Sequence, residues 1–328
     1  MSPRIFVVLL SAMLATSVQA QTSKQPAKPA ATTPATPAQP AQIAPDGDAA
    51  YGAYQRGNYL TALIEAQKRM EQNNDPKAMT LLAELYANGF GVPQNEAKAI
   101  ELYKSAADRG DREAMFQLGL MRFAGRGGKR DPDEAAKLFA AAAKLGSPAA
   151  AYNLALLYLE GQVFPQDFTR AAELFRTSAG AGNPEAQYAL ATLYKEGRGV
   201  EKNPGEAARW LAAATIAGIK DAEVEYAIAL FNGTGVAKDE TKAAEIFLKS
   251  ARQGNPISQN RLAHILFRGR GMPVDQVQAA TWHLVAKAQG NGDPALDELV
   301  SKLSPEDKAS ADKGAKPWLD FPANRGSN

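Results

Sequence analysis

The sequence predicts an all-α fold: a right-handed α-solenoid superhelix of tandem helix-turn-helix repeats. The first observation is a strict period, because glycines recur every 36 residues in two separate series along the 328-residue chain. The second is that each period contains two helical patterns. Repeats of about 20 to 50 residues are typical of solenoids, in which each unit buries its apolar face against its neighbours. The two series are Gly89, Gly125, Gly161, Gly197, Gly233, Gly269 and Gly110, Gly146, Gly182, Gly218, Gly254, Gly290.

The first 47 residues precede the repeats and divide into two segments. Residues 1–20 have a basic start at Arg4, a short apolar run and the small-residue ending Val18-Gln19-Ala20. This is the pattern of a secretory signal peptide, with cleavage expected after Ala20; a retained membrane anchor is the weaker alternative because the apolar run is short. Residues 21–47 are built mainly from Pro, Ala, Thr and Gln, a composition typical of a disordered linker.

Residues 48–75 follow the linker and resemble a shorter, degenerate helical hairpin. Tyr51, Tyr54, Leu63 and Met70 flank the turn Gln55-Arg56-Gly57-Asn58. Terminal units of a solenoid are atypical because one of their faces meets water. We therefore expect residues 48–75 to form the N-terminal cap.

Residues 76–291 contain six repeats, and the unit from 184 to 218 shows why each one is a helical hairpin. Apolar residues from 186 to 194 recur at three- and four-residue spacings, and this helix pattern ends at the turn Gly197-Arg198-Gly199-Val200. Asn203 then occupies an N-cap position, with Pro204 in the first turn of a second helix that ends before Gly218.

Two further series support the same register. In each repeat, the second helix begins at a small capping side chain, and an alanine follows four residues after that cap. An invariant methyl group permits close approach of two helices, and a larger side chain there would overpack the contact. The caps are Asn95, Asp131, Asp167, Asn203, Asp239 and Asp275; the alanines are Ala99, Ala135, Ala171, Ala207, Ala243 and Ala279.

Paired glycines such as Gly197 and Gly199 resemble part of a phosphate-binding loop, but each pair follows a helix, whereas a nucleotide-binding loop follows a strand. We interpret them as helix terminators in left-handed conformations. The third unit carries Val163 in place of the second glycine, so its loop is expected to have a different shape.

Residues 292–328 are expected to form C-terminal capping helices and a tail. One helix is predicted to begin at Pro294 and end near Leu303, and another to begin at Pro305 and end near Lys313. The remaining tail, with Trp318 and Phe321, either packs back on the stack or lies free.

The composition excludes several classes of function. The chain has no cysteine, which excludes disulfides, thiolate metal sites and a cysteine nucleophile. Its formal net charge of +2 gives no basis for nucleic-acid binding.

The repeat pattern resembles the Sel-one-like repeat family, a relative of the tetratricopeptide repeat. The resemblance rests on Ala-x3-Leu-Gly/Ala-x2-Tyr-x2-Gly-x-Gly-Val followed by the cap, alanine and glycine positions, over six units from about 76 to 291. It implies an adaptor that presents partners in signalling, quality control, or bacterial envelope and host-contact settings. One bacterial branch has disulfides between its repeats, and the absence of cysteine separates this chain from that branch.

The sequence contains no catalytic constellation. It has two histidines, His264 and His283, at non-equivalent positions of the sixth unit, and no metal-type histidine pair. We expect His283 to be a partly buried aromatic substitute, and His264 to be solvated or in contact with a partner. Acidic residues such as Glu84 are expected on solvent-facing helix surfaces. We therefore expect no catalytic residues, no cofactor and no metal site.

By analogy with tetratricopeptide geometry, three positions of each first helix line the inner, concave face of the superhelix. At these positions the chain carries large apolar and aromatic side chains, which are typical of a partner-binding groove. The alternative is that tight curvature buries many of them in the core. The candidate binding residues are Phe116, Leu120, Phe123, Tyr152, Leu156, Tyr188, Phe231 and Phe267.

The function expected from the sequence is a non-catalytic protein- or peptide-binding adaptor of the bacterial envelope. We expect a periplasmic monomer with no integral membrane span after cleavage of the signal peptide, and an extracellular destination is the alternative. The rival functions are an exported enzyme or cell-wall-interacting protein with its activity in the groove, and a secreted host-interaction factor.

Overall fold

The computed structural model describes residues 48–320, so the expected signal peptide (1–20), the linker (21–47) and Phe321 lie outside the described residues. The described part consists of sixteen α-helices and contains no strand. This confirms the all-α prediction. The helices are α1 (Ala49–Gln55), α2 (Tyr59–Asn73), α3 (Pro76–Asn88), α4 (Glu96–Ala107), α5 (Arg112–Ala124), α6 (Pro132–Lys144), α7 (Pro148–Glu160), α8 (Phe168–Gly180), α9 (Pro184–Glu196), α10 (Pro204–Ile216), α11 (Lys220–Asn232), α12 (Glu240–Arg252), α13 (Pro256–Arg268), α14 (Gln276–Ala288), α15 (Pro294–Ser301) and α16 (Pro305–Asp320).

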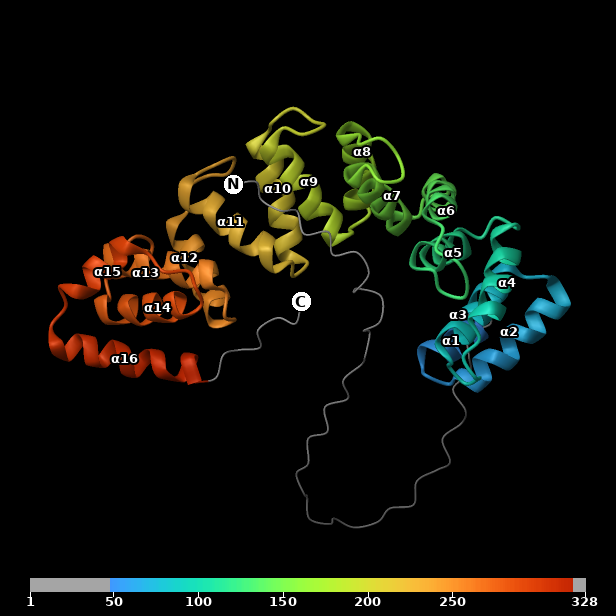
Figure 1. Ribbon diagram of the computed structural model, residues 1–328, viewed down its shortest axis with the longest axis horizontal. Coiled ribbons are helices and arrows are strands. Elements are labelled where there is room, and N and C mark those ends of the chain that lie inside the picture. Colours follow the sequence, from blue (N-terminus) through green and yellow to red (C-terminus); the bar gives the residue numbers. More distant parts are fainter. Residues whose placement is uncertain (1–47, 321–328) are drawn as a thin grey trace, which may run out of the picture.

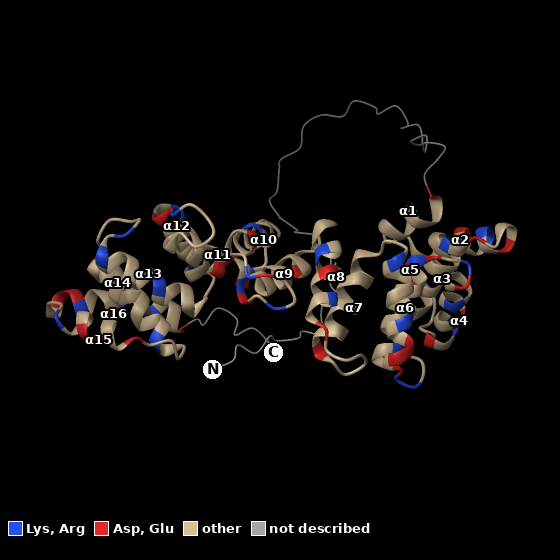
Figure 2. Ribbon diagram, turned by 90° about the horizontal axis from the view of Figure 1, so that it is seen from above, with Lys and Arg blue, Asp and Glu red and all other residues tan. Residues whose placement is uncertain are grey.

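The helices pack as a tandem series of antiparallel hairpins. Each helix packs against the next one along the chain, from α1 to α14, and α16 packs against α14. The hairpins follow one another along an arc, with α3, α5 and α7 on its inner side and α4, α6 and α8 outside them (Figure 1). Charged residues of both signs are interspersed along the whole stack (Figure 2). The first helices of the repeats are therefore placed where a concave surface can form.

The predicted caps define the starts of the second helices. In each repeat, the cap side chain accepts a hydrogen bond from the backbone N–H three residues later, at 2.8 to 3.0 Å. These bonds satisfy amides that have no partner within the helix. The first helices end as predicted, because the first glycine of each turn, such as Gly197 at φ 72°, adopts the left-handed conformation.

The second glycine of the turn has a role that the sequence did not reveal, since it contacts the preceding repeat. A Cβ added at Gly199 would lie 2.1 Å from the carbonyl oxygen of Phe168, the first residue of α8. Equivalent overlaps occur at Gly235 and Gly271. These glycines therefore permit backbone contact between successive hairpins, in addition to ending a helix.

The loop of the third repeat differs, as predicted. Among residues 48–320, Asn74 is the only non-glycine residue with a positive φ, so Val163 does not reproduce the glycine conformation. Val163 and Phe164 instead pack against the core of the second and third repeats, and the Phe164 ring stacks on Tyr158 with centroids 4.8 Å apart. In this loop, apolar packing of Val163 and Phe164 replaces the backbone contact that the second glycine makes in other repeats, and the loop follows a different path.

The invariant alanines lie at the helix contacts. Ala135 and Ala171 have no exposed surface, and the largest exposure in the whole series is 4%, at Ala207. Leu102 and Trp282, three residues after their alanines, are also buried. The invariant alanines therefore lie in the interfaces between neighbouring helices, as predicted.

We expect Ala135→Leu to lower the free energy of unfolding by about 1 to 3 kcal/mol, because a larger side chain must displace packed neighbours. Ala140→Leu is the matched control, since Ala140 lies on the exposed face of the same helix, α6. Denaturant unfolding followed by circular dichroism measures both changes. Equal losses at the two positions would show that packing at Ala135 is not the cause.

The C-terminal cap extends further than the sequence indicated. The last helix was predicted to end near Lys313, but α16 continues to Asp320 and includes Pro317. The ring of Trp318 packs on Trp282 of α14, with centroids 4.9 Å apart. This contact attaches the end of α16 to the last repeat, so the part of the tail up to Asp320 packs on the stack.

The N-terminal cap is attached by a polar contact that contradicts the expected position of Glu84. Instead of facing solvent freely, Glu84 is half-buried and accepts a 2.6 Å hydrogen bond from the Tyr54 hydroxyl of α1. Burial raises the pKa of the Glu84 carboxyl. Tyr54 of the N-terminal cap and Glu84 of α3 are in contact because the N-terminal cap packs over the open side of the first repeat.

Candidate functional site

The eight predicted binding residues lie on five consecutive first helices, and we refer to them as the concave stripe. They are Phe116, Leu120 and Phe123 on α5; Tyr152 and Leu156 on α7; Tyr188 on α9; Phe231 on α11; and Phe267 on α13. The tandem packing of the hairpins places these helices one after another along the arc (Figure 1).

Two members of the concave stripe are core residues, which corrects the prediction for them. Phe116 is only 2% exposed, and its ring packs against Phe139 of α6 at a centroid distance of 5.8 Å. Gly119 makes room for this ring, since a Cβ there would lie 2.7 Å from Phe139. Leu156 is 6% exposed and packs in the core formed by the third and fourth repeats. Curvature of the stack thus removes these two side chains from the binding face.

The other six members of the concave stripe remain half-buried, with part of each side chain accessible to a ligand. Tyr152 rests on the buried ring of Phe175, with centroids 5.6 Å apart. Burial raises the pKa of Tyr152 to about 12, so its hydroxyl stays protonated and able to donate at neutral pH. Half-buried aromatic side chains supply apolar contact area without first having to be ordered by a partner.

Tyr188 is held by a charged neighbour from the next repeat. Its hydroxyl donates to Glu225 Oε1 at 3.0 Å, and Lys195 Nζ lies 2.6 Å from Glu225 Oε2. Burial and the Glu225 carboxylate raise the pKa of the Tyr188 hydroxyl. The three side chains join α9 to α11 and fix the orientation of the Tyr188 ring.

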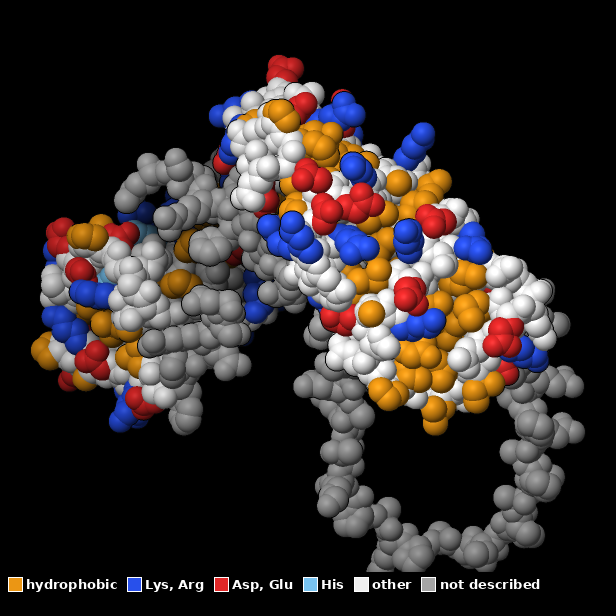
Figure 3. All heavy atoms as spheres, turned by 45° about the vertical axis from the view of Figure 1, so that its right-hand side comes forward, with side chains coloured by type: hydrophobic (Ala, Val, Ile, Leu, Met, Phe, Trp, Pro, Cys, Tyr) orange, Lys and Arg blue, Asp and Glu red, His pale blue; other side chains and the backbone are white. Residues whose placement is uncertain are grey.

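Arginines stack on two of the stripe's phenylalanines, an arrangement that the sequence did not indicate. The guanidinium carbon of Arg130 lies 5.0 Å from the Phe123 ring centroid, and that of Arg270 lies 4.3 Å from the Phe231 ring centroid. Both arginines come from the segments that follow first helices. Hydrophobic side chains gather in bands between charged ones on the face shown in Figure 3, which carries the N-terminal half of the stack. The two stacked guanidinium groups place positive charge beside the apolar side chains of the stripe.

A pocket of about 210 Å³ lies between α11 and α13, next to Phe231 of the concave stripe. Its apolar lining comes from Ile228, Phe231, Phe247 and Ile265. Its polar lining is Asn232, Arg261, His264, Arg268 and Arg270, and includes no carboxylate. Sequence reasoning missed this pocket; the signal was the concentration of basic residues at 261, 268 and 270 in a chain whose charges are otherwise mixed.

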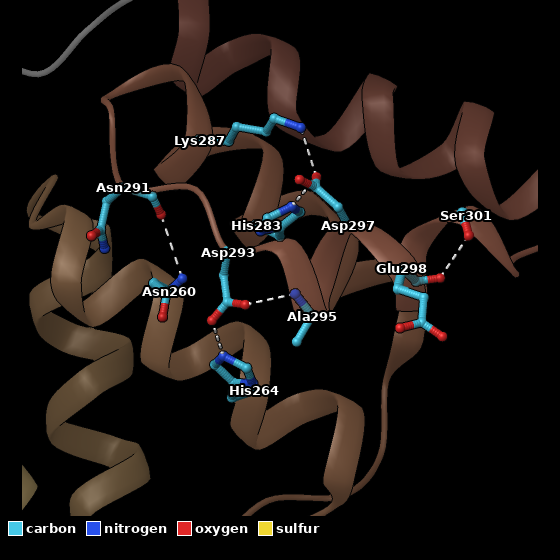
Figure 4. A network of polar contacts seen from close by, with 10 residues as sticks. All are labelled: Asn260, His264, His283, Lys287, Asn291, Asp293, Ala295, Asp297, Glu298 and Ser301. Carbon is cyan, nitrogen blue, oxygen red and sulfur yellow. Dashed lines mark hydrogen bonds and ion pairs between the residues drawn. The ribbon is translucent and has the colours of Figure 1, made fainter.

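The two histidines connect the last repeat to the C-terminal cap (Figure 4). His264 is not freely solvated, because its Nε2 lies 2.7 Å from Oδ2 of Asp293, the N-cap of α15, and its expected contact with a partner stays a prediction. His283 is 1% exposed, more deeply buried than expected, with Nε2 2.8 Å from Asp297 Oδ1. The hydrogen bonds from His264 and His283 lower the pKa values of Asp293 and Asp297, respectively. Both histidines therefore have a structural partner.

Within residues 48–320, no three or more His, Asp or Glu side chains are grouped so as to hold a metal ion. In the same part of the chain, no helix has the length and apolar character needed to cross a membrane. What the described surface offers is a row of half-buried apolar side chains and an adjacent basic pocket.

The chain belongs to the Sel1 repeat family, the Sel-one-like family of the sequence analysis. The family model matches residues 76–111, 112–147, 148–183, 184–218, 220–255 and 256–291. Proteins of this family are typically protein-interaction scaffolds and are generally non-catalytic.

Solved structures similar to this chain include two Sel1 repeat proteins. One is c5321, a protective antigen of uropathogenic Escherichia coli strains with an SLR fold; it has a TM-score of 0.70 and 31% sequence identity, with 84% of this chain covered. The match spans 61% of the length of that protein. The other is a Sel1 repeat protein from Oxalobacter formigenes, with a TM-score of 0.58 and 25% identity, covering 74% of this chain and 97% of that protein. No curated protein is significantly similar in sequence.

Proposed function

We propose that this protein is an exported, non-catalytic scaffold of the bacterial envelope that binds a protein or peptide through the concave stripe. The observation that carries the proposal is the row of six half-buried side chains, from Leu120 to Phe267, repeated on successive first helices. A partner that covers them buries apolar surface, worth about 25 cal/mol per Å² before the costs of association.

The repeat architecture favours binding over catalysis. Each hairpin contacts only its neighbours, so the fold offers an extended surface, and the pocket beside Phe231, at about 210 Å³, is smaller than the usual small-molecule site of about 300 to 1,000 Å³. The polar groups on this surface, such as Tyr188 with Glu225, connect repeats and orient side chains. By fixing the orientation of exposed side chains, these polar contacts prepare the surface for the recognition of a partner.

Export is supported by the sequence of residues 1–20, which has the pattern of a secretory signal peptide. We expect mass spectrometry of the protein purified from its native cells to find a mature N-terminus at or near Gln21. An intact Met1 in the membrane fraction would contradict cleavage and support a retained anchor.

Affinity capture from cell-envelope extract tests the proposed function. The bait is residues 21–328, and the second bait carries Tyr152→Ala and Tyr188→Ala. We expect one protein to be retained by the wild type and lost with the variant. Equal retention by the two baits would show that the concave stripe is not the binding surface, and turnover of a cell-wall fragment by both would support the enzymatic alternative.

A further inference from the structure

We infer that the pocket between α11 and α13 binds an acidic side chain of the partner, with an apolar residue beside it, and so anchors one end of the bound peptide. This inference rests on the proposed function, because it assigns a ligand chemistry to the C-terminal part of the same surface. The argument depends on the charges in the pocket, on its apolar floor and on its size.

The pocket carries positive charge that the protein does not neutralise. Arg261 and Arg268 line it, both are exposed, and neither forms an ion pair or a side-chain hydrogen bond with any residue from 48 to 320. Arg270 differs from them, because it is paired with Glu240, which also binds Lys238 at 2.8 Å. These two contacts, of which the one with Arg270 is the stronger, hold the pKa of Glu240 at about 2. Glu240 thus balances Arg270 at neutral pH, and two guanidinium groups remain for a ligand.

A carboxylate is the group that these two arginines fit. A guanidinium presents parallel N–H donors that match the two oxygens of a carboxylate, and such charge-assisted bonds are stronger than neutral ones. The pocket lining contains no acidic side chain that would repel an anion. The His264 ring lines the same pocket, with its Nε2 bonded to Asp293.

The rest of the lining indicates what flanks the carboxylate. Ile228, Phe231 and Ile265 form an apolar floor beside the arginines. The volume, about 210 Å³, is below the range of drug-sized ligand sites and is suited to one or two side chains of an extended peptide. A free phosphate ion leaves the apolar floor unused, so the lining favours an acidic residue next to an aliphatic or aromatic one.

The pocket is continuous with the concave stripe. Phe231 belongs to both, and Ile228 and His264 occupy positions equivalent to Leu120 and Leu156 in other repeats. A peptide that covers Tyr188 on α9 and continues toward α13 reaches the arginines next. The pocket therefore provides a fixed register for a partner that the apolar stripe alone would hold with little specificity.

The test uses short peptides with an acetylated N-terminus and an amidated C-terminus, so that the only carboxylate is a side chain. Fluorescence anisotropy compares binding of a labelled peptide containing Phe-Glu with its Phe-Gln and Ala-Glu counterparts. We expect the Phe-Glu peptide to bind at least tenfold more tightly than either. We expect R261A/R268A to weaken its binding at least tenfold.

The matched control is R56A/R252A, which removes the same charge from two exposed arginines outside the pocket that have no ion pair within residues 48–320. Equal affinity for Phe-Glu and Phe-Gln, equal losses in the two double variants, or no measurable binding of the Phe-Glu peptide would each overturn the inference. Inorganic phosphate is titrated as a competitor. If phosphate binds as tightly as the peptide, and if R261A/R268A abolishes phosphate binding, the site is a phosphate site and the peptide assignment is wrong.

Failure of this inference is distinguishable from failure of the proposed function. If R261A/R268A captures the envelope partner as well as the wild type does, while Tyr152→Ala/Tyr188→Ala loses it, the pocket is not the anchor and the stripe remains the binding surface. If capture is lost in neither variant, the proposed function itself is wrong.

Discussion

Replacing Gly199 with alanine is expected to lower the free energy of unfolding by about 3 kcal/mol or more, because two separate penalties add. The first is conformational: at φ 69°, an L-residue adopts a left-handed backbone that costs about 1 to 2 kcal/mol. The second is steric, since the new Cβ lies 2.1 Å from the carbonyl oxygen of Phe168. Backbone cannot yield as a flexible side chain can, so the fourth hairpin has to move away from the third.

Gly110→Ala separates the two penalties. Gly110 also has a positive φ, 85°, but a Cβ there meets no atom within 4 Å. We expect this variant to lose only the conformational part, about 1 to 2 kcal/mol. Denaturant unfolding and hydrogen exchange measure the two variants, and exchange is informative because repeat arrays do not always unfold in one step. Equal losses would mean that the contact between Gly199 and α8 contributes nothing.

The double variant Tyr152→Ala/Tyr188→Ala is expected to weaken partner binding by about 2 kcal/mol or more, which is at least about 30-fold in Kd. Both side chains are half-buried on neighbouring first helices, and both are positioned by packing or hydrogen bonds, so little entropy is lost when a partner covers them. Isothermal titration calorimetry with the captured partner measures the loss.

Leu145→Ala/Ile216→Ala is the control for this loss. Leu145 and Ile216 are 47% and 89% exposed, respectively, and lie at the ends of the second helices α6 and α10. They are therefore exposed apolar residues outside the concave stripe. A comparable loss of affinity in this control would place the interface elsewhere. Circular dichroism of both double variants verifies that the hairpins remain folded.

Local chemistry explains why so much of the fold was predictable from the sequence. The caps, the glycine helix ends and the buried alanines each act within one hairpin or at a contact repeated in every unit. Asp167, for example, forms its predicted bond with the Arg170 backbone whatever the rest of the chain does. Because the period is strict, one correctly interpreted unit predicts the helices of all six, although the loop of the third unit differs.

The candidate site was only partly predictable because exposure depends on how strongly the stack curves. Position by position, Phe116 and Tyr152 are equivalent, yet Phe116 is buried against Phe139 while Tyr152 stays half-buried. The ring contacts are alike, with centroids 5.8 Å apart for Phe116 and Phe139 and 5.6 Å apart for Tyr152 and Phe175, so the difference in exposure lies in what else covers each side chain. A contact of this kind depends on two helices at once and is not visible in the pattern of either.

Contacts between segments that are distant in the sequence were also not predicted. His264 and Asp293 lie 29 residues apart, and Tyr54 and Glu84 lie 30 apart, so neither pair follows from a helical spacing. The basic pocket was missed for the same reason, because its lining comes from α11, α12, α13 and the loop that contains Arg270. Once the hairpins are stacked, these groups meet at the concave side.

Site-specific photo-crosslinking in the native cells tests the central claim most directly. A photoreactive phenylalanine analogue is placed at Tyr152 or at Phe231 on the concave stripe, and at Leu145 or at Ile216 outside it. We predict that the two stripe positions form adducts with the same envelope protein and that the two outer positions do not. Adducts to that protein from Leu145 or Ile216, with none from Tyr152 or Phe231, would contradict the proposal that this solenoid binds its partner through the concave stripe.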